Sequence, residues 1–127
     1  MHRFLVSAAH KSSGKTTISI GLAAALSSGK FGQPPRTVQP FKKGPDYIDP
    51  LWLSVAAGRP CYNLDFFLSP DSELQAQFAR HGHDAEICLI EGNKGLYDGL
   101  DLDGSNSNAA LARLLDLPVV LVLDARG

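Results

Sequence analysis

The feature that most constrains the fold is an apolar run at residues 4–6 followed by a short polar loop that ends in Gly14, Lys15 and Thr16. A helical pattern follows over residues 18–26. Strand, tight turn and helix in this order bring backbone N–H groups and the positive end of a helix dipole to one point, where a polyphosphate can bind. Gly14 provides the turn, Lys15 a charge for the outer phosphates and Thr16 a hydroxyl for Mg²⁺. The segment therefore predicts a phosphate-binding loop.

The loop departs at one position from the standard spacing, which places a glycine five residues before Gly14, where this chain has Ala9. The alternative is that the Gly-Lys-Thr sequence is only the solvated start of a helix. The strand and helix patterns on either side favour the phosphate loop. The residues expected to hold the nucleotide are Ser12, Ser13, Gly14, Lys15, Thr16 and Thr17.

The composition predicts one small domain. The chain has 127 residues, of which 44% are hydrophobic, and a formal net charge of −1. These values allow a core, and the near-neutral charge without a block of basic residues argues against nucleic acid as the main partner. No apolar run is long enough to span a membrane and no signal-peptide cleavage pattern follows the first residues, so we predict no membrane partner and a cytoplasmic location. Cys61 and Cys88 are expected to be reduced thiols, with a disulfide or a metal pair as the alternative.

The order of apolar and amphipathic segments predicts the fold class. Strands are expected at residues 3–7, 37–41, 63–67, 86–92 and 118–124, the last of them fully buried, and helices at 15–28, 51–57, 70–82 and 107–115. This alternation predicts an α/β domain with a mostly parallel sheet and flanking helices. The apolar positions expected on the buried helix faces are Ile18, Leu22, Ala25, Leu26, Leu74, Phe78 and Ala79. Because the chain stops right after the last strand, we expect a fragment of a larger domain.

Carboxylates follow two of the predicted strands, at the sheet edge where parallel sheets bind ligands. Residues 42–50 are rich in Pro, Gly and charge, which predicts a loop, and Asp46 and Asp49 in it are either ligand-edge carboxylates or caps of turns. Glu91 ends a buried strand in the way that delivers a carboxylate to Mg²⁺, with a turn cap as the alternative. Gly92 would then let the chain turn away without crowding the phosphates.

These segments together resemble the cobyrinic acid a,c-diamide synthase family, whose nucleotide domain is similar to dethiobiotin synthetase. The string Gly-Pro-Asp-Tyr-Ile-Asp-Pro at residues 44–50 is close to diagnostic. The likeness also includes residues 12–17, 39–43, 58–60, 63–65, 91–92, 95–99 and 119–127. It implies a P-loop NTPase-like three-layer sandwich. It further implies that ATP, Mg²⁺ and glutamine-derived ammonia amidate the side-chain carboxylates of a tetrapyrrole, either a corrinoid or siroheme.

The resemblance also implies roles for individual residues. The expected Mg²⁺ ligands are Thr16, Asp46 and Glu91. The expected catalytic residues are Asp49, Asp98 and Lys42. The two acids would orient or deprotonate the ammonia near the substrate carboxylates, and Lys42, in preference to Lys43, would neutralise the phosphoryl group or those carboxylates. The residues expected beside the ring are Asn93, Lys94, Leu96 and Tyr97.

Two segments depart from the family pattern. The signature lysine of related deviant phosphate loops falls on His10, so Lys11 is not assigned that role, and Asn93 and Lys94 replace an apolar pair. The family's C-terminal glutamine amidotransferase domain, with its nucleophilic cysteine, is expected to be absent from this chain. The oligomeric state is left open, a homodimer being one option. Two other function classes also stay open, namely a deviant phosphate-loop ATPase switch and a dethiobiotin-synthetase-like carboxylase.

Overall fold

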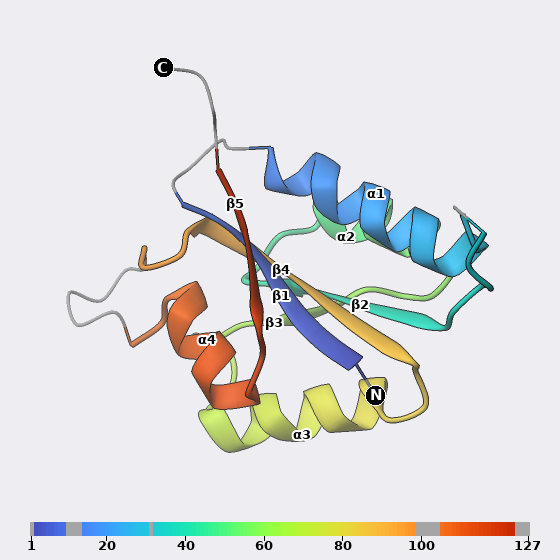
Figure 1. Ribbon diagram of the computed structural model, residues 1–127. Coiled ribbons are helices and arrows are strands. Elements are labelled where there is room, and N and C mark those ends of the chain that lie inside the picture. The colour runs from blue at the N-terminus through green and yellow to red at the C-terminus, as the bar shows by residue number, and fades with distance from the viewer. Residues whose placement is uncertain (1, 10–13, 31, 99–104, 124–127) are drawn as a thin grey trace.

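A five-stranded, all-parallel sheet forms the centre of the protein, with strand order β3-β2-β4-β1-β5 (Figure 1). The structure, a computed structural model, describes residues 2–9, 14–30, 32–98 and 105–123. The strands are β1 (His2–Ala8), β2 (Val38–Lys43), β3 (Tyr62–Leu64), β4 (Ile87–Gly95) and β5 (Val119–Val122). The helices are α1 (Lys15–Ser28), α2 (Asp49–Ala57), α3 (Asp71–Gly82) and α4 (Asn108–Leu115). None of the helices in these ranges combines the length and apolar character that a membrane span needs.

The two faces of the sheet are covered by different pairs of helices, α1 with α2 and α3 with α4 (Figure 1). The chain moves across the sheet from β1 to β2 and β3, and then back to β4 and β5. Because crossovers between parallel strands share one hand, this reversal transfers the connecting helices to the opposite face. The result is three layers, and the predicted α/β class with a parallel sheet is confirmed. It also opens a crevice at the carboxyl ends of β1, β4 and β2, where open α/β sheets bind their ligands.

An apolar layer fills the space on each side of the sheet. The larger one packs the strands against α3 and α4, with Phe41, Leu74 and Leu111 fully buried. The smaller one packs them against α1 and α2, with Val38 and Leu89 at its centre. Side chains alternate between faces along each strand, so β2 sends Val38 to one layer and Phe41 to the other. This alternation also decides where the lysines at the end of β2 point.

Two strands run further than the sequence pattern predicted. β2 continues through Lys42 and Lys43, which were expected in a loop, because their backbones still pair with β4 and β3. β4 likewise continues to Gly95. Residues 65–67, in contrast, do not belong to β3. Strand propensity predicts that a strand ends where charged residues begin. In this protein, polar partners of Lys42 and Lys43 offset the free-energy cost of burying their ammonium groups.

Three burial predictions are wrong. β5 was expected to be fully buried, but Val119, Val120 and Leu121 are all exposed, because β5 is an edge strand of the described sheet. Ile18 is 43% exposed, and the small residues Ser19 and Ala23 face the sheet instead, so α1 lies close to it. In α3, Ala79 is exposed and Gly82 is buried beside Leu74 and Phe78.

Candidate functional site

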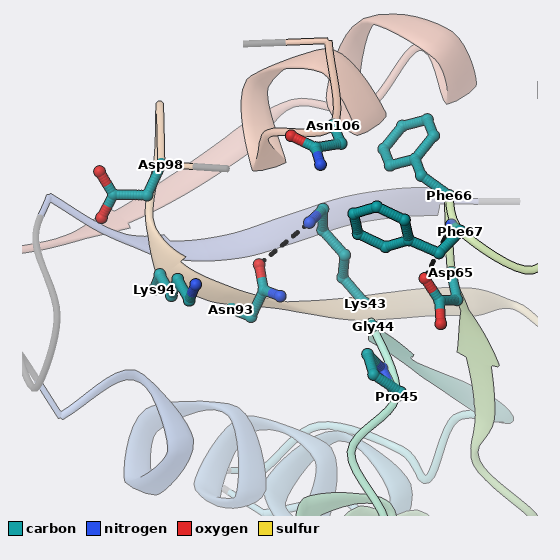
Figure 2. A pocket seen from close by; sticks show the side chains of 10 residues that line it. All are labelled: Lys43, Gly44, Pro45, Asp65, Phe66, Phe67, Asn93, Lys94, Asp98 and Asn106. Carbon is teal, nitrogen blue, oxygen red and sulfur yellow. Dashed lines mark hydrogen bonds between the residues drawn. The ribbon is translucent and has the colours of Figure 1, made fainter. Parts of the chain in front are cut away.

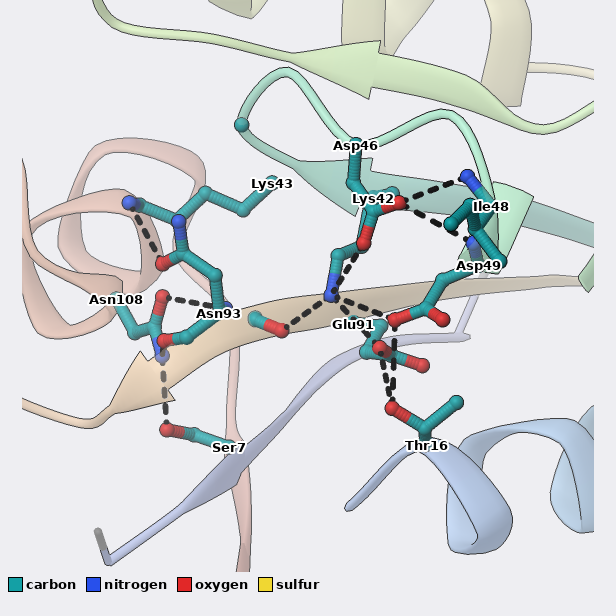
Figure 3. A network of polar contacts seen from close by, with 12 residues as sticks. Ser7, Thr16, Lys42, Lys43, Asp46, Ile48, Asp49, Glu91, Asn93 and Asn108 are labelled. Atoms are coloured by element: carbon teal, nitrogen blue, oxygen red, sulfur yellow. Dashed lines mark hydrogen bonds and ion pairs between the residues drawn. The ribbon is translucent and has the colours of Figure 1, made fainter. Parts of the chain in front are cut away.

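Five polar residues converge at the carboxyl ends of β1, β2 and β4, in the crevice that the sheet topology creates (Figure 3). We call them the Lys42 cluster: Thr16, Lys42, Asp46, Asp49 and Glu91. Thr16 lies in the first turn of α1, Lys42 lies near the end of β2, Asp49 begins α2 and Glu91 lies in β4. Lys42 and Glu91 are register partners of neighbouring strands, which places their side chains on the same face. Residues separated by up to 75 positions in sequence are thereby brought into hydrogen-bond contact.

Lys42 is the cation at the centre of this cluster and is only 2% exposed. Its Nζ donates to Glu91 Oε1 at 2.7 Å, to the Gly92 carbonyl at 3.0 Å and to Asp49 Oδ2 at 3.3 Å. An ammonium group has three hydrogens, so these contacts use all of them. Asp46 Oδ2 is a more distant ionic partner at 3.9 Å. Lys42 is therefore locked in place by the carboxylates on either side of it.

Thr16 joins the phosphate-loop segment to the same carboxylates. Its Oγ1 lies 3.1 Å from Glu91 Oε1 and 3.3 Å from Asp49 Oδ2, and its single proton can be donated to either. Glu91 is fully buried, and its second oxygen, Oε2, has no hydrogen-bond partner in the described structure. A buried carboxylate oxygen without a partner is costly and marks a place where a ligand, an ion or water belongs.

The pKa values of the two acids, Glu91 and Asp49, are shifted in opposite directions. Burial raises the pKa of Glu91, although the Lys42 ammonium beside it acts in the other direction. Burial alone would also raise the pKa of Asp49, but hydrogen bonding with Glu91 and the charge of Lys42 outweigh it and hold this pKa below its usual value. Of the two acids, Glu91 therefore takes up a proton more readily than Asp49.

Asp46 fits both roles that its sequence position allowed. Its Oδ1 accepts from the backbone N–H of Ile48 at 2.8 Å and of Asp49 at 3.2 Å, so it caps the turn that begins α2. Its other oxygen faces Lys42. Asp49 is not a turn cap, because its carboxylate contacts Thr16 and Lys42 across the crevice.

The start of α1 has the geometry expected of an anion site. Gly14 has φ 83°, a left-handed conformation that glycine adopts without strain, and no side chain in the described structure caps the helix. Burial lowers the pKa of the Lys15 ammonium, Lys42 lowers it further, and the carboxylates of the cluster oppose the change. Thr17 follows in the first turn and is exposed. The predicted ligands Ser12 and Ser13, and the positions His10 and Lys11, lie outside the described residues.

The donor set suits a nucleotide-bound Mg²⁺ better than a protein-only metal site. Among the described residues no three His, Cys, Asp or Glu side chains are grouped so that they could hold a metal by themselves. Mg²⁺ differs from most metals in that it takes one or two carboxylates and completes its shell with water and phosphate oxygens. The Thr16 hydroxyl and the unpartnered Glu91 Oε2 are donors of this kind.

Asp98 is not brought together with Asp49, although both were expected near the reacting groups. Its Oδ2 accepts from the Gly95 N–H at 3.0 Å and closes a turn after β4. It lines a separate cavity that contains Lys43 instead of Lys42 (Figure 2). Lys94 also lines that cavity, and Tyr97 is exposed nearby in sequence.

Asn108 is a site-supporting residue that the sequence did not reveal. It is fully buried, and its Nδ2 donates to Ser7 Oγ at 3.0 Å and to the Asn93 carbonyl at 2.6 Å, while its Oδ1 accepts from the Asn93 N–H at 3.1 Å (Figure 3). A Cβ on Gly92 would come within 2.6 Å of this amide, so Gly92 is needed for Asn108 and not for turning the chain away. An Asn at the start of a helix resembles an ordinary cap, which concealed this role.

Comparison with known proteins gives consistent results over the whole chain. A cobyrinate a,c-diamide synthase of Magnetococcus marinus is 53% identical over 124 residues, which cover 98% of this chain and 26% of that protein. The synthases of Synechocystis sp. and Syntrophotalea carbinolica are 42% and 41% identical, over 96% and 98% of this chain. This chain is similar throughout to cobyrinate a,c-diamide synthases. The family resemblance inferred from the motifs is thereby confirmed.

The chain spans about a quarter of the length of the cobyrinate a,c-diamide synthases that it matches, 26% of the Magnetococcus marinus protein and 25% of the Synechocystis sp. protein. A scan against protein-family models finds no match. The similarity therefore concerns one part of these synthases, the part that contains the Lys42 cluster.

Proposed function

We propose that this chain is the nucleotide-binding part of an ATP-dependent amidoligase that converts side-chain carboxylates of a tetrapyrrole into amides. Cobyrinic acid is the substrate that we rank first, with siroheme second. The observation that carries the proposal is the Lys42 cluster at the carboxyl ends of the strands, in a chain similar to cobyrinate a,c-diamide synthases. The chemistry takes place in a soluble, cytoplasmic enzyme with a glutamine amidotransferase domain as the source of ammonia.

The reaction needs a nucleotide because a carboxylate does not condense with ammonia at neutral pH. A substrate carboxylate oxygen would attack the γ-phosphorus of ATP, the bond from that phosphorus to the β,γ-bridging oxygen would break, and ADP would leave. Ammonia would then attack the carbonyl carbon of the acyl phosphate. The carbon–oxygen bond would break, phosphate would leave with the former carboxylate oxygen, and a proton from nitrogen would pass to a base.

The residues of this chain would divide this work between phosphate and substrate. The N–H groups at the start of α1 and Lys15 would hold the phosphates. Thr16, Asp46 and Glu91 would hold Mg²⁺, which supplies positive charge beside the transferred phosphoryl group. Asp49 stays ionised because its pKa is held low, so it is suited to orient the incoming ammonia. Asp98 would act from the substrate side of the site.

Lys42 would move from one set of anions to another during the reaction. Its three hydrogens are held by Glu91, Asp49 and the Gly92 carbonyl when no ligand is bound. With Glu91 serving as a Mg²⁺ ligand, the Lys42 ammonium would be available to donate to the phosphoryl group that is transferred. Lys42 would thereby neutralise the negative charge that develops during phosphoryl transfer.

The full-length enzyme should be given ATP, Mg²⁺ and glutamine with cobyrinic acid and siroheme in parallel, and the products weighed by mass spectrometry. Formation of a corrinoid diamide supports the proposal. Amidation of siroheme alone would keep the chemistry and change the substrate. ATP turnover that needs no tetrapyrrole, or that needs a diamino acid, would replace the proposal with an ATPase switch or a dethiobiotin-synthetase-like carboxylase.

A further inference from the structure

The lysine next to Lys42 opens onto a different part of the molecule. Lys43 follows it along β2, so its side chain points to the opposite face of the sheet, toward α4 (Figure 2). There it borders a cavity of about 340 Å³, which we call the Lys43 cavity. The residues that line it are Lys43, Gly44, Pro45, Asp65, Phe66, Phe67, Asn93, Lys94, Asp98 and Asn106.

The Lys43 ammonium is buried but only partly satisfied. The residue is 6% exposed, and its Nζ donates one hydrogen bond within the described structure, to Asn93 Oδ1 at 3.1 Å. The ring of Phe66 lies 5.8 Å from Nζ, close enough for a cation–π contact. The other two ammonium hydrogens therefore have no hydrogen-bond partner among the described residues.

The charges around Lys43 do not neutralise it fully. The pKa of Lys43 is lowered to about 8, chiefly by burial; the Asp65 carboxylate opposes this change, and the charges of Lys94 and Lys42 add to it. Asp65 is itself used by the fold, because its Oδ1 accepts from the Phe67 N–H at 3.0 Å. Such a cation is stabilised by an anion that enters the cavity.

The walls of the Lys43 cavity indicate what the anion is attached to. Pro45, Phe66 and Phe67 give it an apolar and partly aromatic lining, and Phe67 is 64% exposed. A small hydrophilic anion such as phosphate would gain nothing from these side chains. A carboxylate on the edge of a flat apolar ring would use both the ammonium and the aromatic walls.

The Lys43 cavity adjoins the crevice in front of the Lys42 cluster. A second, more open hollow of about 420 Å³ is lined by Lys42, Asp46, Tyr47 and Ile48 and shares Lys43, Pro45 and Asn93 with the first. Ligand pockets usually measure about 300 to 1,000 Å³, and both hollows lie at the small end of this range. Each hollow alone therefore holds only part of a large ligand. One large polycarboxylate can lie across both.

We propose that Lys43 anchors a carboxylate of the macrocycle other than the one that reacts, and that it thereby selects which carboxylate reaches the Lys42 cluster. This inference rests on the proposed function, since it requires a substrate with several carboxylates around an apolar ring. Lys43 is then a specificity-determining residue that contacts the substrate without taking part in the chemical step.

The test compares Lys43→Met with Lys43→Arg in the full-length enzyme, with Lys30→Met as a matched control for the loss of one charge. Lys30 is exposed and follows α1, away from both hollows. Binding of cobyrinic acid is measured by equilibrium dialysis, using its absorbance, and the products of turnover are measured by mass spectrometry. We expect Lys43→Met to raise the Kd for cobyrinic acid about 10- to 100-fold, with partial rescue by Arg. The KM for ATP and the melting temperature should stay as in Lys30→Met, and the position of the first amide should become mixed.

Each other result would overturn the inference. Unchanged binding and an unchanged first amide in Lys43→Met would remove Lys43 from the substrate site while the proposed function stands. An equal loss of ATP affinity would assign Lys43 to the nucleotide instead. If the wild-type enzyme binds no tetrapyrrole at all, the proposed function and this inference both fail.

Discussion

Lys42 and Lys43 are consecutive, chemically identical and almost equally buried, at 2% and 6% exposure, yet they lie in opposite environments. Lys42 has three hydrogen bonds and two close carboxylates, whereas Lys43 has one amide partner and an aromatic ring. Because side chains alternate between the two faces along β2, the two ammonium groups lie on opposite sides of the sheet. A strand that ends at a ligand-binding edge can therefore present one cation to a nucleotide and the next to a second ligand.

The largest expected effect comes from Lys42→Met. Removing this ammonium leaves Glu91 and Asp49 without their shared cation, and breaking a buried ion pair costs about 3 to 5 kcal/mol. We expect the free energy of unfolding, measured by denaturant titration, to fall by that amount and amide synthesis to be lost.

Lys43→Met is the matched variant for this comparison. It replaces a poorly neutralised cation by an apolar side chain of similar length, so its free energy of unfolding should change by less than about 1 kcal/mol. Equal destabilisation of the two variants would contradict the view that the lysines have different environments.

The next effect in size is expected for Glu91→Gln, which keeps the volume of the side chain and removes its charge. The Mg²⁺ concentration needed for half-maximal activity should rise about 10- to 100-fold, because an interaction with a charged group of about 1.5 to 3 kcal/mol is lost. Nucleotide binding measured without Mg²⁺ should weaken much less. Equal losses in the two measurements would show that Glu91 has a structural role only.

The sequence predicted the sheet and the helices well, because β1, α1 and α3 are decided by local periodicity and by turns. It placed both lysines in a loop instead of in β2, because their partners Glu91 and Asn93 lie 49 and 50 positions away, beyond any local window. Asn108 was missed for the same reason, as its bonds to Ser7 join residues 101 positions apart. The exposure of β5 depends on its place at the edge of the described sheet, which hydrophobicity does not report.

The affinity for the macrocycle, measured over a range of pH, tests whether Lys43 differs from Lys42 in its environment. The Lys43 pKa of about 8 lies below that of an ordinary lysine, so the free enzyme loses this charge as the pH rises through about 8. Affinity for a carboxylate-bearing macrocycle should be full below that value and fall above it. Wild-type binding should show this decline between pH 7 and about 9.5, and Lys43→Arg, which stays charged, should not. The same decline in both proteins would assign the titration to another group.

The smallest effect is expected at the two thiols. The pKa of Cys61 is raised to about 12, chiefly by burial and also by the Glu91 carboxylate of the Lys42 cluster, and burial raises the pKa of Cys88 to about 11. Within the described residues neither cysteine forms a disulfide. Because the thiolate is the reactive form, neither should react with a thiol reagent at pH 8 until the protein is unfolded. Rapid labelling of native Cys61 would show that its surroundings are less negative or less enclosed than the structure indicates.

Oxygen transfer tests most directly whether the Lys42 cluster activates a carboxylate with ATP. The full-length enzyme should be supplied with ATP, Mg²⁺, ammonia and cobyrinic acid labelled with ¹⁸O in its carboxylates, and the released phosphate examined by mass spectrometry. We predict one ¹⁸O atom in phosphate for every amide formed, because the carboxylate oxygen leaves with the phosphoryl group. Amide formation with unlabelled phosphate would contradict an acyl phosphate, and with it the proposed role of the Lys42 cluster.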